Sequence, residues 1–275
     1  MPPTADSDFG LYVHLPWCVS KCPYCDFNSH ALKTPELPEA AYVDALVRDL
    51  AQEARLARDQ GWHRPFDTVF FGGGTPSLFS AGAIGRILEA ASADFGVNPG
   101  AEITLEANPG TVERTSFPGL AAAGVNRVSL GAQSFDDDRL KALGRVHRAA
   151  DTADAVEEIR RGGIDNINID VMYALPGQSI DGALADLDAA LALNPSHLSH
   201  YQLTLEPNTL FHHDPPELPD DDTAWTIHER SLERLAAAGF AQYEISAYAH
   251  AGQTARHNLV YWRFGDYVGI GAGAH

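Results

Sequence analysis

The chain has 275 residues, 45% of them hydrophobic, which fits one large α/β domain or two small ones. Its net charge of −18 argues against a nucleic-acid partner, because phosphate binding needs clustered basic residues. The same charge excludes a polybasic anchor, so membrane contact is expected to be at most peripheral. The polar stretch Met1–Gly10 lacks the basic and apolar regions of a signal peptide, and we therefore expect a cytoplasmic protein.

Short β-branched or aromatic runs alternate along the chain with longer runs that carry apolar residues at helical spacing. The expected strands, in chain order, are Leu11–Trp17, Thr68–Gly72, Glu102–Glu106, Arg127–Gly131, Asn166–Ala174, Leu198–Leu205 and Tyr243–Tyr248. The expected helices between them are Glu39–Ala57, Ala83–Phe95, Phe117–Ala123, Ala150–Arg161, Asp181–Leu193 and Thr223–Ala238.

This alternation predicts parallel strands joined by right-handed crossovers, in a sheet whose apolar strands are covered on both faces. We expect an α/β fold with an incomplete (β/α) barrel of about six parallel strands, and a doubly wound sheet is the alternative. Either topology places ligand sites at the carboxyl ends of the strands. We expect a core over 8–240 and the start of a truncated C-terminal region over 241–275, because the chain stops among glycine-rich turn residues.

The only three cysteines lie together just after the first expected strand, as Cys18-x3-Cys22-x2-Cys25. Ligands three to four residues apart can reach several irons of a [4Fe–4S] cluster, and three of them leave one iron open for a small molecule. A zinc site completed by His14 or His30 is an alternative, although zinc sites usually space their ligands as two separated pairs. A buried set of cysteines without metal is the remaining alternative.

The segment Leu11–His30, with its cysteine spacing and with Tyr24 before the third cysteine, resembles the radical SAM superfamily. Within that superfamily it is similar to the group of oxygen-independent coproporphyrinogen III dehydrogenase and the HemW haem chaperones. The resemblance implies that the cysteines bind a [4Fe–4S] cluster, whose open iron is chelated by S-adenosylmethionine (SAM). It also implies that an electron, supplied by a separate donor, cleaves SAM to methionine and a 5′-deoxyadenosyl radical.

Unusual polar and glycine residues follow the other expected strands. Gly72–Pro76 (GGGTP) by itself is a tight turn or a loop whose backbone approaches a ligand closely. Glu106 could pair with an ammonium or cap a turn, whereas Asp170, inside an apolar strand, needs a partner for its charge. The resemblance implies a SAM-binding role for residues that match the dehydrogenase pattern, namely Tyr12, Tyr24, Gly73, Gly74, Thr75, Glu106, Gln133, Arg145 and Asp170.

Two features favour the chaperone branch of the group. Phe27 stands where the dehydrogenase has a fourth cysteine, and His257–Trp262 (HNLVYW) matches a signature of HemW proteins. The resemblance implies haem as cargo, with His257 in its binding, and delivery to haem-requiring respiratory proteins. A histidine bonded within a turn is the structural alternative for His257. The dehydrogenase, a radical enzyme of porphyrin biosynthesis, is the alternative function, so the sequence leaves enzymatic activity and the catalytic residues open.

Overall fold

The computed structural model describes residues 8–34, 36–114 and 116–274, so Met1–Ser7 of the polar N-terminal stretch and His275 lie outside it. Its described strands form a nine-stranded sheet in the order β11-β1-β4-β5-β6-β7-β8-β10-β9, and β2 pairs with β3 separately. The first seven strands of that order are parallel, and β10 and β9 are antiparallel. The strands are β1 Gly10–Leu15, β2 Trp17–Cys18, β3 His30–Ala31, β4 Phe66–Gly73, β5 Val97–Ala107, β6 Arg127–Gln133, β7 Asn166–Tyr173, β8 His197–Gln202, β9 Ala241–Gln242, β10 Ala247–Ala249 and β11 Tyr267–Ile270.

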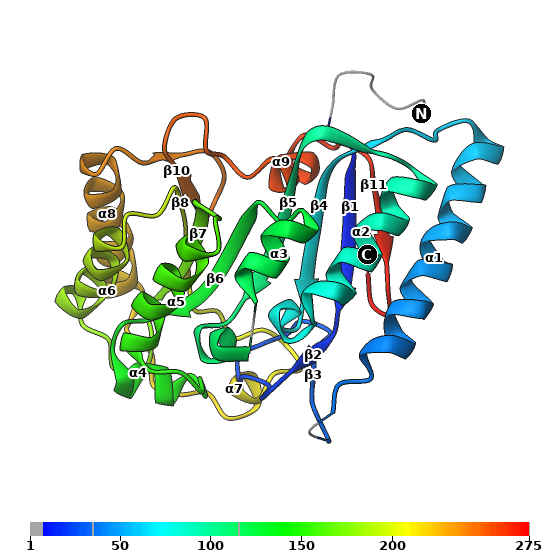
Figure 1. Cartoon of the computed structure of the whole chain (residues 1–275). Helices are drawn as coiled ribbons and strands as arrows, with labels where there is room; N and C mark the ends of the chain where they lie inside the picture. Colours follow the sequence, from blue (N-terminus) through cyan, green and yellow to red (C-terminus); the bar gives the residue numbers. More distant parts are fainter. Residues whose placement is uncertain (1–7, 35, 115, 275) are drawn as a thin grey trace.

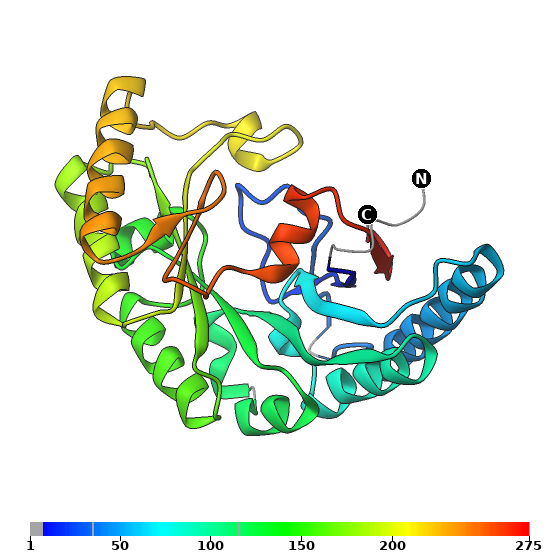
Figure 2. The ribbon, with the colours of Figure 1, turned by 90° about the horizontal axis from the view of Figure 1, so that it is seen from above.

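The long helices form an arc around the outer face of the curved sheet, as Figure 2 shows from above. This arrangement is the incomplete (β/α) barrel that the sequence predicts. The helices of this arc are α1 Glu39–Gln60, α2 Ala81–Asp94, the seven-residue α3 Phe117–Ala123, α5 Ala149–Arg161, α6 Ile180–Ala192 and α8 Asp221–Ala237. The shorter elements are η1 Pro76–Leu78, η2 Pro109–Arg114, α4 Asp137–Ala142, α7 Leu210–His213 and α9 Arg256–Trp262.

The strands divide their side chains between two environments. In β1, Leu11, Val13 and Leu15 are fully buried against the helix layer, in the core that also takes the apolar face of α1. The alternate residues Tyr12 and His14 face the barrel interior, where the Tyr12 hydroxyl lies 3.0 Å from His14 Nδ1. Period-two alternation therefore gives this barrel an apolar outer layer and a polar interior.

Helix α9 and the short strands β2 and β3, which flank the cysteine loop, lie at opposite ends of the barrel. Figure 1 shows α9 beside the amino ends of β4 and β5, and β2 and β3 near the carboxyl ends. The backbone N–H groups of Arg256 and His257 donate to the two carboxylate oxygens of Glu102, at 3.1 and 3.0 Å. This carboxylate satisfies the first N–H groups of α9 and interacts favourably with the helix dipole.

Three expectations need correction in the last part of the chain. The strand expected over Tyr243–Tyr248 is wrong: a turn interrupts it, and β9 and β10 are short and antiparallel. Strand β11, which pairs with β1 and brings the number of parallel strands among the described residues to seven, and helix α9 were not expected from the sequence. The boundary at residue 240 stays a prediction, and described residues beyond it contribute strands to the main sheet. No helix in the part of the chain that the structure describes is long and apolar enough to cross a membrane.

Candidate functional site

The three cysteines lie on a loop that leaves β1 and closes on itself. Backbone bonds join Cys25 N–H to the Cys22 carbonyl at 3.2 Å and Leu32 N–H to the Cys18 carbonyl at 2.9 Å. The ammonium of Lys21 donates to the carbonyls of Phe27 and Ser29, at 2.9 and 3.0 Å, and so ties the two sides of the loop together. All three thiols are free and half-buried, and the loop therefore presents them as available ligands.

The glycines after β4 allow the backbone to pass close beneath this loop. A Cβ on Gly74 would lie 2.5 Å from the carbonyl oxygen of Trp17, the residue before the first cysteine. Gly73 has a φ of 111°, which L side chains rarely adopt. The N–H of Thr75 donates to the Trp17 carbonyl at 2.7 Å, so the two loops share a hydrogen bond. The GGGTP motif thus supports the cysteine loop, because it packs closely against the backbone at the start of that loop.

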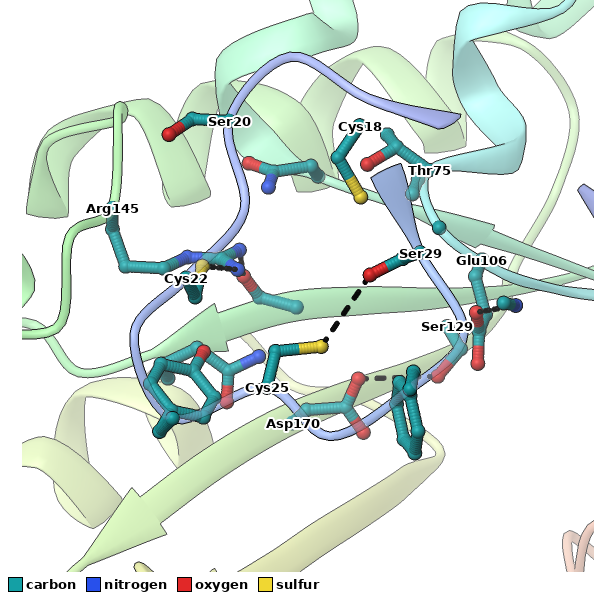
Figure 3. A pocket seen from close by; sticks show the side chains of 18 of the residues that line it. Cys18, Ser20, Cys22, Cys25, Ser29, Thr75, Glu106, Ser129, Arg145 and Asp170 are labelled. Carbon is teal, nitrogen blue, oxygen red and sulfur yellow. Dashed lines mark hydrogen bonds between the residues drawn. The ribbon is translucent and has the colours of Figure 1, made fainter. Parts of the chain in front are cut away.

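The cysteine loop and the strand ends enclose one cavity (Figure 3). All the predicted site residues except Tyr12 and His257 line it, so the carboxyl ends of the strands meet as expected. The lining residues that the sequence analysis predicted are Cys18, Cys22, Tyr24, Cys25, Gly73, Gly74, Thr75, Glu106, Gln133, Arg145 and Asp170. Those it did not predict are Ser20, Phe27, Ser29, Ala107, Asn108, Ser129, Gly131 and Tyr201.

Two carboxyl groups, Glu106 on β5 and Asp170 on β7, face the cavity from strands on either side of β6, and both lie deep in the protein. Burial, followed by the nearby charge of Asp170, raises the pKa of Glu106 to about 8, and the N–H of Gly73 partly offsets this by donating to Oε2 at 3.1 Å. Burial also raises the pKa of Asp170, while hydrogen bonds from Ser199 and Asn168 and the charge of Arg127 lower it. A cation in the cavity would lower both pKa values, and the pair therefore suits a positively charged ligand.

The opposite wall combines a guanidinium with aromatic rings. Arg145 donates from Nη2 to the Gly131 carbonyl at 2.6 Å, and its Nη1 lies 3.7 Å from the Cys22 sulfur. Tyr201 donates to Oε1 of Gln133 at 2.7 Å. Tyr201 lies in the middle of the predicted strand Leu198–Leu205 but near the carboxyl end of the observed β8, so correct strand bounds together with the rule that ligand sites lie at strand ends could have found it.

Tyr12 and His257 lie outside the cavity lining. Tyr12 is behind it, close enough for the charge of Glu106 to contribute to the raised pKa of its hydroxyl, after burial. His257, with only 2% of its surface exposed, is at the amino end of the strands, where its Nδ1 lies 2.8 Å from Thr68 Oγ1 and its Nε2 3.1 Å from the Tyr261 hydroxyl. Burial lowers the pKa of His257 to about 3, so the ring is neutral.

The geometry fits a cluster better than a single zinc ion. Three cysteines around one cavity suit a cubane, because its irons are separated and the ligands need not converge on one point. Within residues 8–34, 36–114 and 116–274, no three His, Cys, Asp or Glu side chains group so as to hold one metal ion. The expected fourth zinc ligands are also engaged: both ring nitrogens of His14 have partners, and His30 Nε2 lies 3.1 Å from Asn28 Oδ1.

Substituting Gly74 with alanine should displace the cysteine loop. The added methyl would meet the Trp17 carbonyl oxygen at 2.5 Å, and because the atoms it meets are all backbone of Pro16 and Trp17, no side chain can move to make room. We expect a loss of about 1–3 kcal/mol of stability, from overpacking, together with reduced iron content. Melting temperature and iron analysis measure both effects.

Gly85→Ala in α2 is the matched control, because its Cβ would meet only the Ala123 methyl, at 3.6 Å. Alanine in a helix interior should stabilise by about 0.5–1 kcal/mol, with no change in iron content. A Gly74→Ala protein with wild-type iron content and stability would contradict the supporting role of this glycine.

The chain as a whole is similar to several known proteins. The model of the radical SAM superfamily matches residues 12–190. The protein named "Heme chaperone HemW" from Haemophilus influenzae is 51% identical over 265 residues, which cover 96% of this chain and 69% of that protein. Its namesake from Escherichia coli is 53% identical, with the same coverage. The solved structure of Escherichia coli coproporphyrinogen III oxidase (HemN), titled a radical SAM enzyme, superposes with a TM-score of 0.83 over 98% of this chain and 64% of that one. At 24% identity, that likeness shows the fold alone.

Proposed function

This chain belongs to the radical SAM superfamily and, within it, to the HemW family, and from that premise we propose that it is a haem chaperone carrying a SAM-bound [4Fe–4S] cluster. Cys18, Cys22 and Cys25 hold the cluster, and the residues lining the same cavity hold SAM. When bound, such a cluster supplies one-electron chemistry that cleaves SAM. The observation that carries this proposal is the convergence of three free thiols and two buried carboxyl groups on one cavity.

The chain's own residues bind and orient SAM in this proposal. Glu106 and Asp170 compensate the positive charge of SAM. Its sulfonium and ammonium groups are cations, and a cation bound nearby lowers the raised pKa values of the two carboxyl groups and so favours their ionised forms. Arg145, beside the Cys22 sulfur, stabilises the negative charge that a thiolate brings into the cavity. Tyr24 and Tyr201 cover one side with aromatic surface, which keeps water from the bound ligand.

Haem is the proposed cargo, by analogy with the printed name of the relatives, and His257 is the proposed axial ligand. A neutral imidazole is the form that ligates a metal. To reach haem iron, the ring would have to leave Thr68 and Tyr261, and α9 would have to shift. Trp262, at the end of α9, and Phe264, just after it, are exposed aromatic side chains and offer an apolar platform for a flat macrocycle.

The remaining parts of the proposal concern partners and place. We propose that haem passes to haem-requiring respiratory proteins and that a separate electron donor reduces the cluster. A cytoplasmic location would keep the three thiols reduced before the cluster assembles. Decarboxylation of coproporphyrinogen III is not proposed, because an exposed Phe27 stands where the dehydrogenase has its fourth cysteine.

Haem binding and decarboxylation should be measured on one anaerobically reconstituted sample of the full-length protein. We expect a Soret band from bound haem and no oxidative decarboxylation of coproporphyrinogen III with SAM and reductant present. His257→Ala should shift or abolish the Soret band, whereas His250→Ala, which removes a half-buried ring that packs against Phe240 outside α9, should leave it unchanged. Porphyrinogen decarboxylation at enzyme-like rates, or no haem binding at all, would refute the chaperone proposal.

A further inference from the structure

A chain of hydrogen bonds crosses the barrel interior from the SAM cavity to the start of α9. The N–H of Ala255, the N-cap residue of α9, donates to the Tyr243 hydroxyl at 3.2 Å. That hydroxyl lies 2.7 Å from Nε2 of His197, whose Nδ1 lies 2.6 Å from Oδ1 of Asn168. Asn168 Nδ2 then donates to Oδ1 of Asp170 at 2.7 Å. The chain thus connects a cavity-lining carboxyl group with the helix that carries the proposed haem ligand.

The barrel register places these groups in line. Asn168 and His197 are paired residues of the parallel strands β7 and β8, so their side chains lie side by side on the inner face. Both side chains are about 1% exposed. Asp170 lies two residues further along β7, on the same face and one step nearer the carboxyl end. Asn258 of α9 also faces the Tyr243 hydroxyl, which gives the far end of the chain a second contact with that helix.

The donors and acceptors available to each group give all four hydrogen bonds the same direction. The amide oxygen of Asn168 can only accept, so His197 donates to it from Nδ1. Burial lowers the pKa of His197 to about 2, so the ring is neutral and its Nε2 accepts from Tyr243. The Tyr243 oxygen is then left to accept from Ala255. Each group donates toward Asp170, and chains of this kind polarise one another cooperatively.

We propose that His197 and Tyr243 are positioning residues for SAM, which hold Asp170 through Asn168 and thereby couple the cavity to the start of α9. The proposal rests on the proposed function in one respect, namely that Asp170 binds SAM. A ligand bound to Asp170 changes which hydrogen bonds the oxygens of this carboxylate can accept. The change reaches Ala255 through these four hydrogen bonds. If SAM binding changes the equilibrium between two positions of α9 by a certain factor, thermodynamic reciprocity requires that SAM affinity differ between these two positions by the same factor.

The substitution Tyr243→Phe tests this coupling, because it removes one hydroxyl and interrupts the hydrogen-bond chain next to its α9 end. We expect SAM affinity of the cluster-loaded full-length protein to fall about three- to tenfold, as for the loss of one ordinary hydrogen bond. Hydrogen exchange at residues 255–262 should slow on SAM addition in the wild type, and this response should be lost in the variant. His197→Gln, whose amide can both donate and accept, should retain more affinity than His197→Leu.

Tyr173→Phe is the matched control: its hydroxyl lies 3.3 Å from His228 Nδ1, also a histidine ring nitrogen, and outside this chain. It should leave SAM affinity and exchange at 255–262 unchanged. In an Asp170→Ala background, Tyr243→Phe should have less than about a twofold further effect, since coupled residues are not additive. An undiminished effect there, or no SAM-dependent exchange at 255–262 in a wild type that binds SAM, would overturn the proposal. A wild type that does not bind SAM would instead overturn the proposed function.

Discussion

Replacing Cys22 with alanine should abolish the iron–sulfur cluster. Anaerobically reconstituted wild-type protein should hold about four irons and four sulfides, with a cluster signal that SAM perturbs. The variant retains two thiols on the same loop, too few to hold three irons. Iron and sulfide analysis and electron paramagnetic resonance of the reduced protein measure the loss.

Val19→Ala is the control for this substitution, because it shortens an exposed side chain on the same loop and removes no ligand. It should keep the cluster and its response to SAM. Full iron content in the Cys22→Ala protein, or native protein that holds only zinc, would refute the assignment of the cysteine loop.

Glu106→Gln should weaken SAM binding and stabilise the SAM-free protein. Loss of a charged partner of a bound cation costs about 1.5–3 kcal/mol, roughly tenfold to 150-fold in affinity. The buried carboxyl has a pKa of about 8, because burial and the charge of Asp170 disfavour its ionised form. The neutral amide of glutamine avoids the free-energy cost of burying a charge, so the variant should be more stable than the SAM-free wild type. Functional sites commonly show this trade-off, in which a residue that favours binding lowers stability. Titration with SAM and melting temperature measure the two effects.

The stability gained by Glu106→Gln over the SAM-free wild type should increase with pH. The pKa of Glu106 in the folded protein is about 8, above the value near 4.3 of an unfolded glutamate, so the folded state binds more protons between these values. Stability of the SAM-free wild type therefore falls as pH rises through this window, and Glu106→Gln removes that contribution. Asp67→Asn, near the amino end of β4 and so at the opposite edge of the sheet from Glu106, should leave SAM affinity unchanged. Wild-type SAM affinity in Glu106→Gln would exclude Glu106 as a SAM ligand.

The placement of the SAM residues could be predicted because it follows from topology. Glu106, Gln133 and Asp170 stand at or near the carboxyl ends of three consecutive strands, and parallel pairing brings such ends to one edge. No long-range contact has to be known for that step. Tyr201 follows the same rule on β8, and was missed because an aromatic at the end of an apolar strand resembles core.

The last part of the chain could not be predicted in the same way. The segment Tyr267–Ile270 is too short to show a strand by its pattern, and it becomes one because β1 offers an unpaired edge. The predicted strand Tyr243–Tyr248 is broken instead. The hydroxyl of Tyr243 lies 2.7 Å from Nε2 of His197, in the barrel interior. Local preference is a weak guide in both segments, because pairing with distant residues decides their conformation.

The sequence by itself determined that three thiols lie together on one loop and in which order the strands and helices of the barrel follow one another. Both depend on spacing along a few residues, and backbone geometry limits what such spacing can form. Only the tertiary structure decided that His257 lies buried between Thr68 and Tyr261, at the far end of the barrel from the cysteines. The reason is physical: α9 begins where the Glu102 carboxylate accepts its first N–H groups, and Glu102 lies 155 residues away from His257 along the chain.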